Sequence, residues 1–156
     1  MPSRKYYDRT ALVVDDEVLN IEFLEAFLNK LGFEVFTAHD GKMALEVCSG
    51  LLAVSRPIDV IFMDFSMPDM NGDECTKQLK SSKLHDVTSN SVIVGLTAHR
   101  DQDVRAKCLA AGMNEVIFKP FNQHQIIGLI DSFFPPLSRI SFHTQQIEQD
   151  ISVNSK

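Results

Sequence analysis

Five short apolar runs, each followed by a stretch with helical periodicity, constrain the fold of this chain more than any other feature. Short continuous apolar runs are typical of strands that are covered on both faces. Neighbouring parallel strands need a crossover connection, which is usually a helix, so the alternation predicts an α/β fold with a doubly wound, five-stranded parallel sheet and helices on both faces. Five units are too few for a (β/α)₈ barrel. The predicted strands are 11–14, 34–37, 58–63, 92–96 and 116–118.

The stretches between these runs repeat apolar residues at helical spacing and carry helix boundary signals. In the first stretch the apolar residues fall on one helical face from Val18 to Leu31, and Gly32 follows where a glycine commonly ends a helix. Pro135 and Pro136 stop the last stretch. The predicted helices are 18–31, 41–52, 73–82, 101–111 and 122–134, with a polar connection through residue 90 after the third.

The composition is that of a globular protein with an acidic balance. Of 156 residues, 44% are hydrophobic, and 15 Lys and Arg against 21 Asp and Glu give a formal net charge of −6. Domains that bind nucleic acid normally carry a basic surface, so this charge argues against a nucleic-acid partner. Neither a secretory signal nor an apolar stretch of membrane-spanning length is visible. We expect a cytoplasmic monomer with one domain over 9–134, an N-terminal extension over 1–8 and a C-terminal tail or linker over 135–156.

Polar residues follow four of the five predicted strands directly. Asp15 and Asp16 follow the first strand, Asp64 the third, Thr97 the fourth and Lys119 the fifth. Ligands of open parallel sheets bind beyond the carboxyl ends of the strands, so these side chains are expected to converge. Clustered carboxylates favour a hard cation such as Mg²⁺, and an Asp can act as a nucleophile toward a phosphoryl group. The lysine and the hydroxyl supply donors for the phosphoryl oxygens.

Each of these residues also has an ordinary structural interpretation. Asp15 or Asp16 can cap the first helix, Asp64 can be a turn residue, Thr97 can cap the fourth helix, and Lys119 can be a solvated strand-end lysine. The occurrence of the whole set at four strand ends favours a functional site over four coincidences.

Four segments carry a resemblance to a known family. The segments VVDDE at 13–17, IFMDFSMPDMNG at 61–72, GLTAH at 95–99 and FKPF at 118–121 resemble the receiver domain of two-component phosphorelays, in order as well as in motif. The resemblance covers about residues 9–134. It implies a flavodoxin-like sheet with strand order 2-1-3-4-5, and a function as a phosphoacceptor that takes a phosphoryl group from a phosphohistidine.

The resemblance also implies roles for single residues. Asp64 corresponds to the phosphoacceptor. Asp15, Asp16 and the backbone carbonyl of Ser66 correspond to the Mg²⁺ ligands beside it, with Asp16 binding directly and Asp15 partly through water. Thr97 and Lys119 correspond to the groups that bind phosphoryl oxygens, and the bond before Pro120 to a cis peptide. Such a domain promotes its own phosphorylation and dephosphorylation and is not a dedicated metabolic enzyme.

Further short sequence segments indicate the subfamily, and two alternative functions remain open. Asn20 in DDEVLN, together with GLTAH and AAGMNEVIFKPF, resembles receivers attached to hybrid histidine kinases, so the expected partners are a histidine kinase or a histidine-phosphotransfer domain. Val116 departs from the family, since many receivers have an aromatic switch residue there. One alternative is a Mg²⁺-dependent phosphohydrolase, which would need an acid at Ser66. The other is an interaction module that is not phosphorylated, which should have lost Asp64 or Lys119.

Overall fold

The computed structural model describes residues 5–81 and 83–135. The expected tail over 135–156 lies outside the described residues except for its first residue, as does most of the N-terminal extension. Along the described chain the elements are β1 (Thr10–Val14), α1 (Val18–Leu31), β2 (Glu34–Ala38), α2 (Gly41–Ala53), β3 (Val60–Asp64), α3 (Gly72–Leu79), α4 (His85–Thr88), β4 (Val92–Thr97), α5 (Gln102–Ala111), β5 (Glu115–Phe118) and α6 (Gln123–Phe133).

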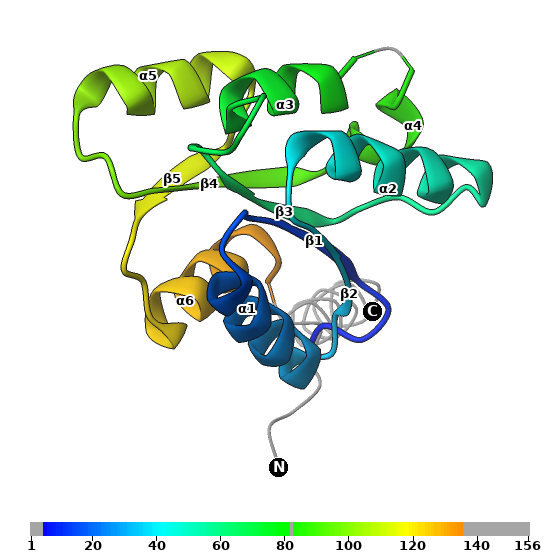
Figure 1. Ribbon diagram of the computed structural model, residues 1–156. Coiled ribbons are helices and arrows are strands. Elements are labelled where there is room, and N and C mark those ends of the chain that lie inside the picture. Colours follow the sequence, from blue (N-terminus) through cyan, green and yellow to red (C-terminus); the bar gives the residue numbers. More distant parts are fainter. Residues whose placement is uncertain (1–4, 82, 136–156) are drawn as a thin grey trace, which may run out of the picture. The chain divides into compact units, whose positions relative to one another are not determined.

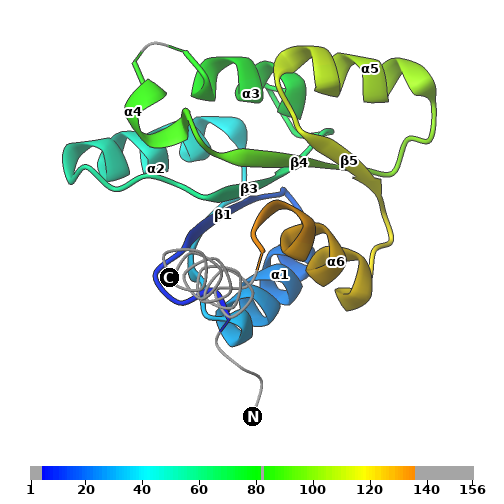
Figure 2. The same cartoon turned by 180° about the vertical axis from the view of Figure 1, so that it is seen from behind.

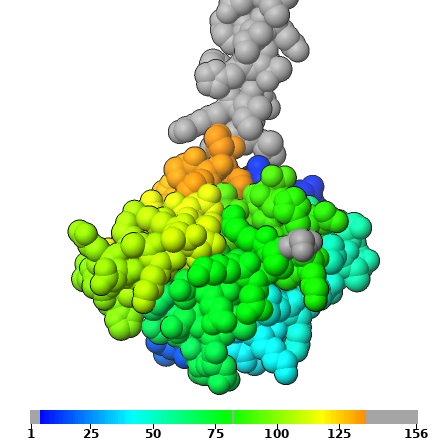
Figure 3. Space-filling model, turned by 90° about the horizontal axis from the view of Figure 1, so that it is seen from above, coloured from blue at the N-terminus to red at the C-terminus, as the bar shows by residue number. Residues whose placement is uncertain are grey.

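The five strands form one parallel sheet in the order β2-β1-β3-β4-β5. This confirms the predicted doubly wound, flavodoxin-like arrangement. In Figure 1, α2, α3, α4 and α5 lie above the sheet and α1 lies below it, and Figure 2 shows the same layers from behind. Figure 3 looks down on the upper layer of helices. The helix α6 belongs to a separate compact unit that starts at Asn122, and a capping box between Asn122 and Gln125 begins it.

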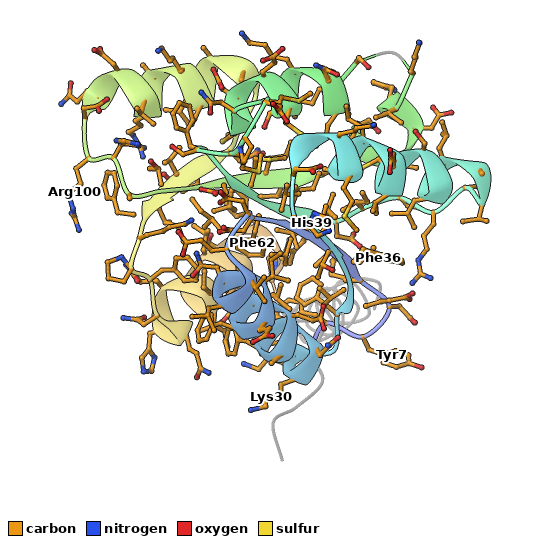
Figure 4. The ribbon with its side chains drawn as sticks, viewed as in Figure 1. Tyr7, Lys30, Phe36, His39, Phe62 and Arg100 are labelled. Atoms are coloured by element: carbon orange, nitrogen blue, oxygen red, sulfur yellow. The ribbon has the colours of Figure 1, made fainter. Side chains whose placement is uncertain are left out.

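Alternation along the strands divides the core between the two faces of the sheet. The larger cluster lies under the upper helices and includes Leu12, Ile61 and Ile93, all fully buried. Within each strand, the alternate residues point to the other face of the sheet. Helix α1 covers that face with Leu24, Leu28 and Leu31. Phe62, labelled in Figure 4, is one of these alternate residues. Burial on both faces explains why the strands read as continuous apolar runs.

Two local features differ from the sequence-based expectation. The connection after α3 contains the short helix α4, whose Thr88 hydroxyl donates to the Leu79 carbonyl at 2.6 Å. Tyr6, placed in the expected N-terminal extension, is buried and stacks on Phe33 with ring centroids 5.1 Å apart. The chain before β1 therefore contributes to the core. No helix in the described ranges has the length and apolar character needed to cross a membrane.

Candidate functional site

The parallel register brings the ends of β3, β4 and β5 together at one edge of the sheet. Asp64 pairs with Leu96, and Thr97 pairs with Phe118. The backbone N–H of Lys119 then donates to the Thr97 carbonyl at 2.8 Å. Asp64, Thr97 and Lys119, three of the residues expected to converge, therefore lie at the ends of neighbouring strands.

Lys119 is the cation that contacts the acidic side chains at the carboxyl ends of these strands. Its Nζ lies 2.9 Å from Asp15 Oδ2 and 3.1 Å from Asp64 Oδ1, so one ammonium contacts both carboxylates. Only 14% of the Lys119 side chain is exposed. The interpretation of Lys119 as a solvated strand-end lysine is therefore wrong, and the residue is a half-buried counterion of two buried carboxylates.

Three carboxylates cluster at this end of the sheet, two of them in contact with the lysine. Asp15, Asp16 and Asp64 each offer an oxygen, and these oxygens lie within 4.8 Å of one another. Asp15 and Asp64 are buried, whereas Asp16 is exposed. Carboxylates this close repel one another, and a single lysine cannot neutralise three.

Asp15 does not cap α1 in the usual way. The N-cap residue is Glu17, which makes no side-chain capping bond, and the Glu17 N–H itself donates to Asp15 Oδ1 at 2.9 Å. An N-cap side chain would instead accept from the second or third helical N–H. A backbone N–H of the loop before α1 thus holds one oxygen of the Asp15 carboxylate, and the other oxygen contacts Lys119.

Thr97 is not a helix cap either. Its Oγ1 accepts from the His99 N–H at 3.0 Å within the β4–α5 loop, and Asp101 caps α5 by accepting from Val104 N–H at 2.8 Å. Thr97 is buried at the end of β4. A hydrogen bond therefore connects the Thr97 hydroxyl to the β4–α5 loop.

Burial and like charge perturb the titration of the site. Burial raises the pKa of Asp64 from 3.8 to about 7, the Asp15 carboxylate and a hydrogen bond with Asp16 add to the rise, and Lys119 opposes it. Burial alone would lower the pKa of Lys119, but its hydrogen bond to Asp15 and the charge of Asp64 outweigh burial and raise this pKa above 10.5. These effects favour the charged form of Lys119 and the protonated form of Asp64, each relative to an exposed side chain of its kind.

Gly72 is a site residue that the sequence reasoning missed. A Cβ on Gly72 would lie 2.2 Å from the backbone oxygen of Asp64, and the Gly72 N–H donates to the Phe65 carbonyl at 2.7 Å. The start of α3 therefore packs directly onto the end of β3, which only a residue without a side chain permits. The Asn71–Gly72 pair was the available sequence signal, although Asn-Gly usually indicates a turn rather than a close approach.

Ser66 and Val116 lie as their sequence positions suggest. Ser66 is exposed in the loop after Asp64, so no carboxyl group stands where a phosphohydrolase would need one. Val116 is buried in the core cluster. Nearby, the exposed Arg100 carries its guanidinium over the Phe118 ring, 4.9 Å from the centroid. Figure 4 shows Arg100 on the loop that follows β4.

Fold and site together define a doubly wound α/β domain with a carboxylate–lysine cluster at the carboxyl ends of its strands. The family model of the response regulator receiver domain matches residues 11–131 of the chain. The chain therefore belongs to the receiver domains of two-component signalling.

Relatives and solved structures agree with this membership. The chain is 37% identical over 119 residues to histidine protein kinase 1 of Candida albicans, covering 74% of the chain but 5% of that kinase. It is 31% identical over 137 residues to two-component response regulator 24 of Arabidopsis thaliana, covering 87% of the chain and 86% of that protein. The receiver domain of sensor histidine kinase PA1611 of Pseudomonas aeruginosa, solved with a magnesium ion in its active-site cleft, superimposes with a TM-score of 0.66 at 28% identity, covering 80% and 96% of the two chains.

Proposed function

We propose that this chain is a phosphoacceptor that takes a phosphoryl group from a phosphohistidine onto Asp64 in a two-component phosphorelay. The observation that carries the proposal is the pairing of a buried Asp64 carboxylate with Lys119 Nζ at 3.1 Å, beside two further carboxylates. A structural ion pair needs one acid, whereas a phosphoryl site needs a nucleophile, a cation and acids that hold a metal.

The transfer step follows from the positions of the chain's own groups. An Asp64 carboxylate oxygen forms the new O–P bond while the P–N bond to the donor imidazole breaks, and the imidazole nitrogen leaves with the bonding pair. Lys119 and the Thr97 hydroxyl donate to the phosphoryl oxygens as charge shifts between donor and acceptor. For Thr97 this requires its hydroxyl to turn from its loop toward the phosphoryl group.

The donor set fits Mg²⁺. Asp15, Asp16 and Asp64 provide hard oxygens, the exposure of Asp16 leaves room for water, and the Ser66 carbonyl is the proposed further ligand. Bound there, the ion would neutralise charge on the phosphoryl oxygens. The magnesium named for the Pseudomonas receiver supports this assignment.

The relatives support the choice of partner. The Candida protein is named a histidine kinase, and the chain spans only a small part of its length. We therefore propose a histidine kinase or histidine-phosphotransfer domain as the phosphodonor. In this role residues 9–134 form the receiver and act in the cytoplasm as a monomer. Residues 1–8 are the N-terminal extension, and residues 135–156 are the C-terminal tail or linker.

Labelling with a small phosphodonor tests the proposal. Incubation with phosphoramidate and Mg²⁺ is expected to add one phosphoryl group per chain, located at Asp64 by peptide mass spectrometry and removable by hydroxylamine, as for an acyl phosphate. A chelator is expected to prevent the labelling. A label on a serine or histidine, or labelling that ignores the chelator, would contradict the proposal.

The stability of the metal-free protein is expected to fall as pH rises from about 4 to about 7. Because the pKa of Asp64 is raised from 3.8 to about 7 in the folded state, the unfolded chain releases this proton first, and folded-state stability is lost over that interval. The loss is on the order of 3 kcal/mol from this group. Urea unfolding of wild type and Asp64→Asn across this range measures it as the difference between the two proteins.

Magnesium provides the complementary measurement. At pH 8 Mg²⁺ is expected to raise the melting temperature of wild type by mass action, and to raise that of Asp16→Asn less. If the two proteins respond alike, or neither responds, the acidic cluster does not hold the ion.

A further inference from the structure

The side chain of Asn20, in the first turn of α1, joins two carboxylates. Its Nδ2 donates to Asp15 Oδ2 at 3.2 Å and to Glu17 Oε2 at 3.3 Å. A primary amide has two hydrogens on one nitrogen and no charge, so it can satisfy two acids without introducing a cation. Asn20 is half-buried, whereas Glu17 is exposed.

Asp15 receives donors of two kinds. The Glu17 N–H and the Asn20 amide are neutral, and Lys119 is charged and shared with Asp64. If Lys119 turns to a phosphoryl group, as the proposed function requires, the Glu17 N–H and the Asn20 amide are the donors among the described residues that still contact the buried Asp15 carboxylate. An unsatisfied buried carboxylate is costly, so these two hydrogen bonds keep the Asp15 carboxylate oriented during transfer.

We propose that Asn20 is a positioning residue for the cation site, acting through Asp15. This inference rests on the proposed function. A neutral donor suits the task because a lysine or arginine at this place would repel the divalent ion, and an aspartate would add a further negative charge to the cluster. Asn20 holds the carboxylate without competing for the site.

If the role of Asn20 were purely structural, it would depend on the contact of Asn20 with Glu17 and not on the contact with Asp15. Glu17 is the N-cap residue of α1 and lacks a side-chain capping bond, so the Asn20–Glu17 contact alone would brace the first helical turn. Glu17→Ala removes that contact but keeps the Asn20–Asp15 bond and the backbone donor. Asn20→Ala removes both contacts of the amide. The two variants therefore separate the two roles.

Binding of Mn²⁺ tests the proposal on the full chain, with the free ion counted by electron paramagnetic resonance. Mn²⁺ takes the same oxygen ligands as Mg²⁺. Asn20→Ala is expected to weaken binding about 10-fold, the lower end for loss of a group that orients a metal ligand. Glu17→Ala is expected to weaken it about twofold, since it removes only a screened charge. Asn20→Leu, which keeps the volume and removes the donors, is expected to match Asn20→Ala.

The matched control is Asn29→Ala, an exposed position near the other end of α1, which is expected to bind as wild type does. Metal-free melting temperatures, measured for every variant, show whether each one is folded. Equal losses in Asn20→Ala and Glu17→Ala, or an Asn20→Ala affinity equal to wild type, would overturn the inference alone. Absence of Mn²⁺ binding in wild type would overturn the proposed function and the inference with it.

Discussion

Replacing Asp64 with Asn is expected to abolish phosphoryl labelling. The amide is no nucleophile, and its loss of charge also weakens the hold on a divalent ion. The shape of the side chain is kept, and the amide oxygen can still accept from Lys119. The metal-free variant is expected to be more stable than wild type at pH 8, because it no longer buries a carboxylate whose pKa is raised to about 7. Phosphate incorporation and urea unfolding on the same sample separate lost chemistry from lost fold.

The matched control makes the same change in the loop that follows. Asp69 is exposed and has a φ of 67°, in the left-handed region that asparagine tolerates well. Asp69→Asn should therefore keep both the fold and the labelling. Full labelling of Asp64→Asn at the wild-type rate would remove Asp64 from the proposed function and leave the acidic cluster without a nucleophile.

The second large effect is expected from Gly72→Ala. The new Cβ would lie 2.2 Å from the Asp64 carbonyl oxygen, far inside van der Waals contact, so α3 or the end of β3 has to move. Overpacking of this kind is expected to cost about 2–3 kcal/mol, a shift in melting temperature of about 5–10 °C for a chain of this size. Displacement of Asp64 should slow its labelling as well. Thermal unfolding and the labelling rate give the two readouts.

Gly50→Ala serves as the comparison for Gly72→Ala. Gly50 lies within α2, and nothing stands within 4 Å of a Cβ built on it. The same substitution there should stabilise the protein by about 0.5–1 kcal/mol, because alanine favours a helix. A Gly72→Ala variant as stable as Gly50→Ala would show that the approach of α3 to Asp64 relaxes at no cost.

Strong local signals explain how much of the fold could be predicted. Helix α1 has the bounds expected from its apolar period and from Gly32, which takes a φ of 108° at its end. The short helix α4 could not be found, because four residues show no helical period and its Thr88 is held by a carbonyl nine residues earlier. Burial of Tyr6 likewise depends on contacts with residues distant in sequence.

In the candidate site, too, some features could be predicted from local sequence and others depend on contacts between distant residues. Asp15, Asp64 and Lys119 each follow a predicted strand directly. This predicted that they lie at the same end of the sheet, because the carboxyl ends of parallel strands meet there. Sequence could not show that one ammonium bridges both acids, because that depends on side-chain rotamers. The role of Gly72 was hidden as well, since a close approach of two backbones leaves no trace in periodicity.

The bridge made by Lys119 also bears on how cooperatively the domain folds. Lys119 lies 55 residues after Asp64 and reaches it only when β5 has paired with β4. A partial sheet in which β1 and β3 have joined without β5 would bring Asp15 and Asp64 together with no counterion. Without the Lys119 ammonium, repulsion between the two carboxylates opposes such a partial sheet. We therefore expect the Lys119 bridge to couple pairing of β5 to the assembly of β1 and β3.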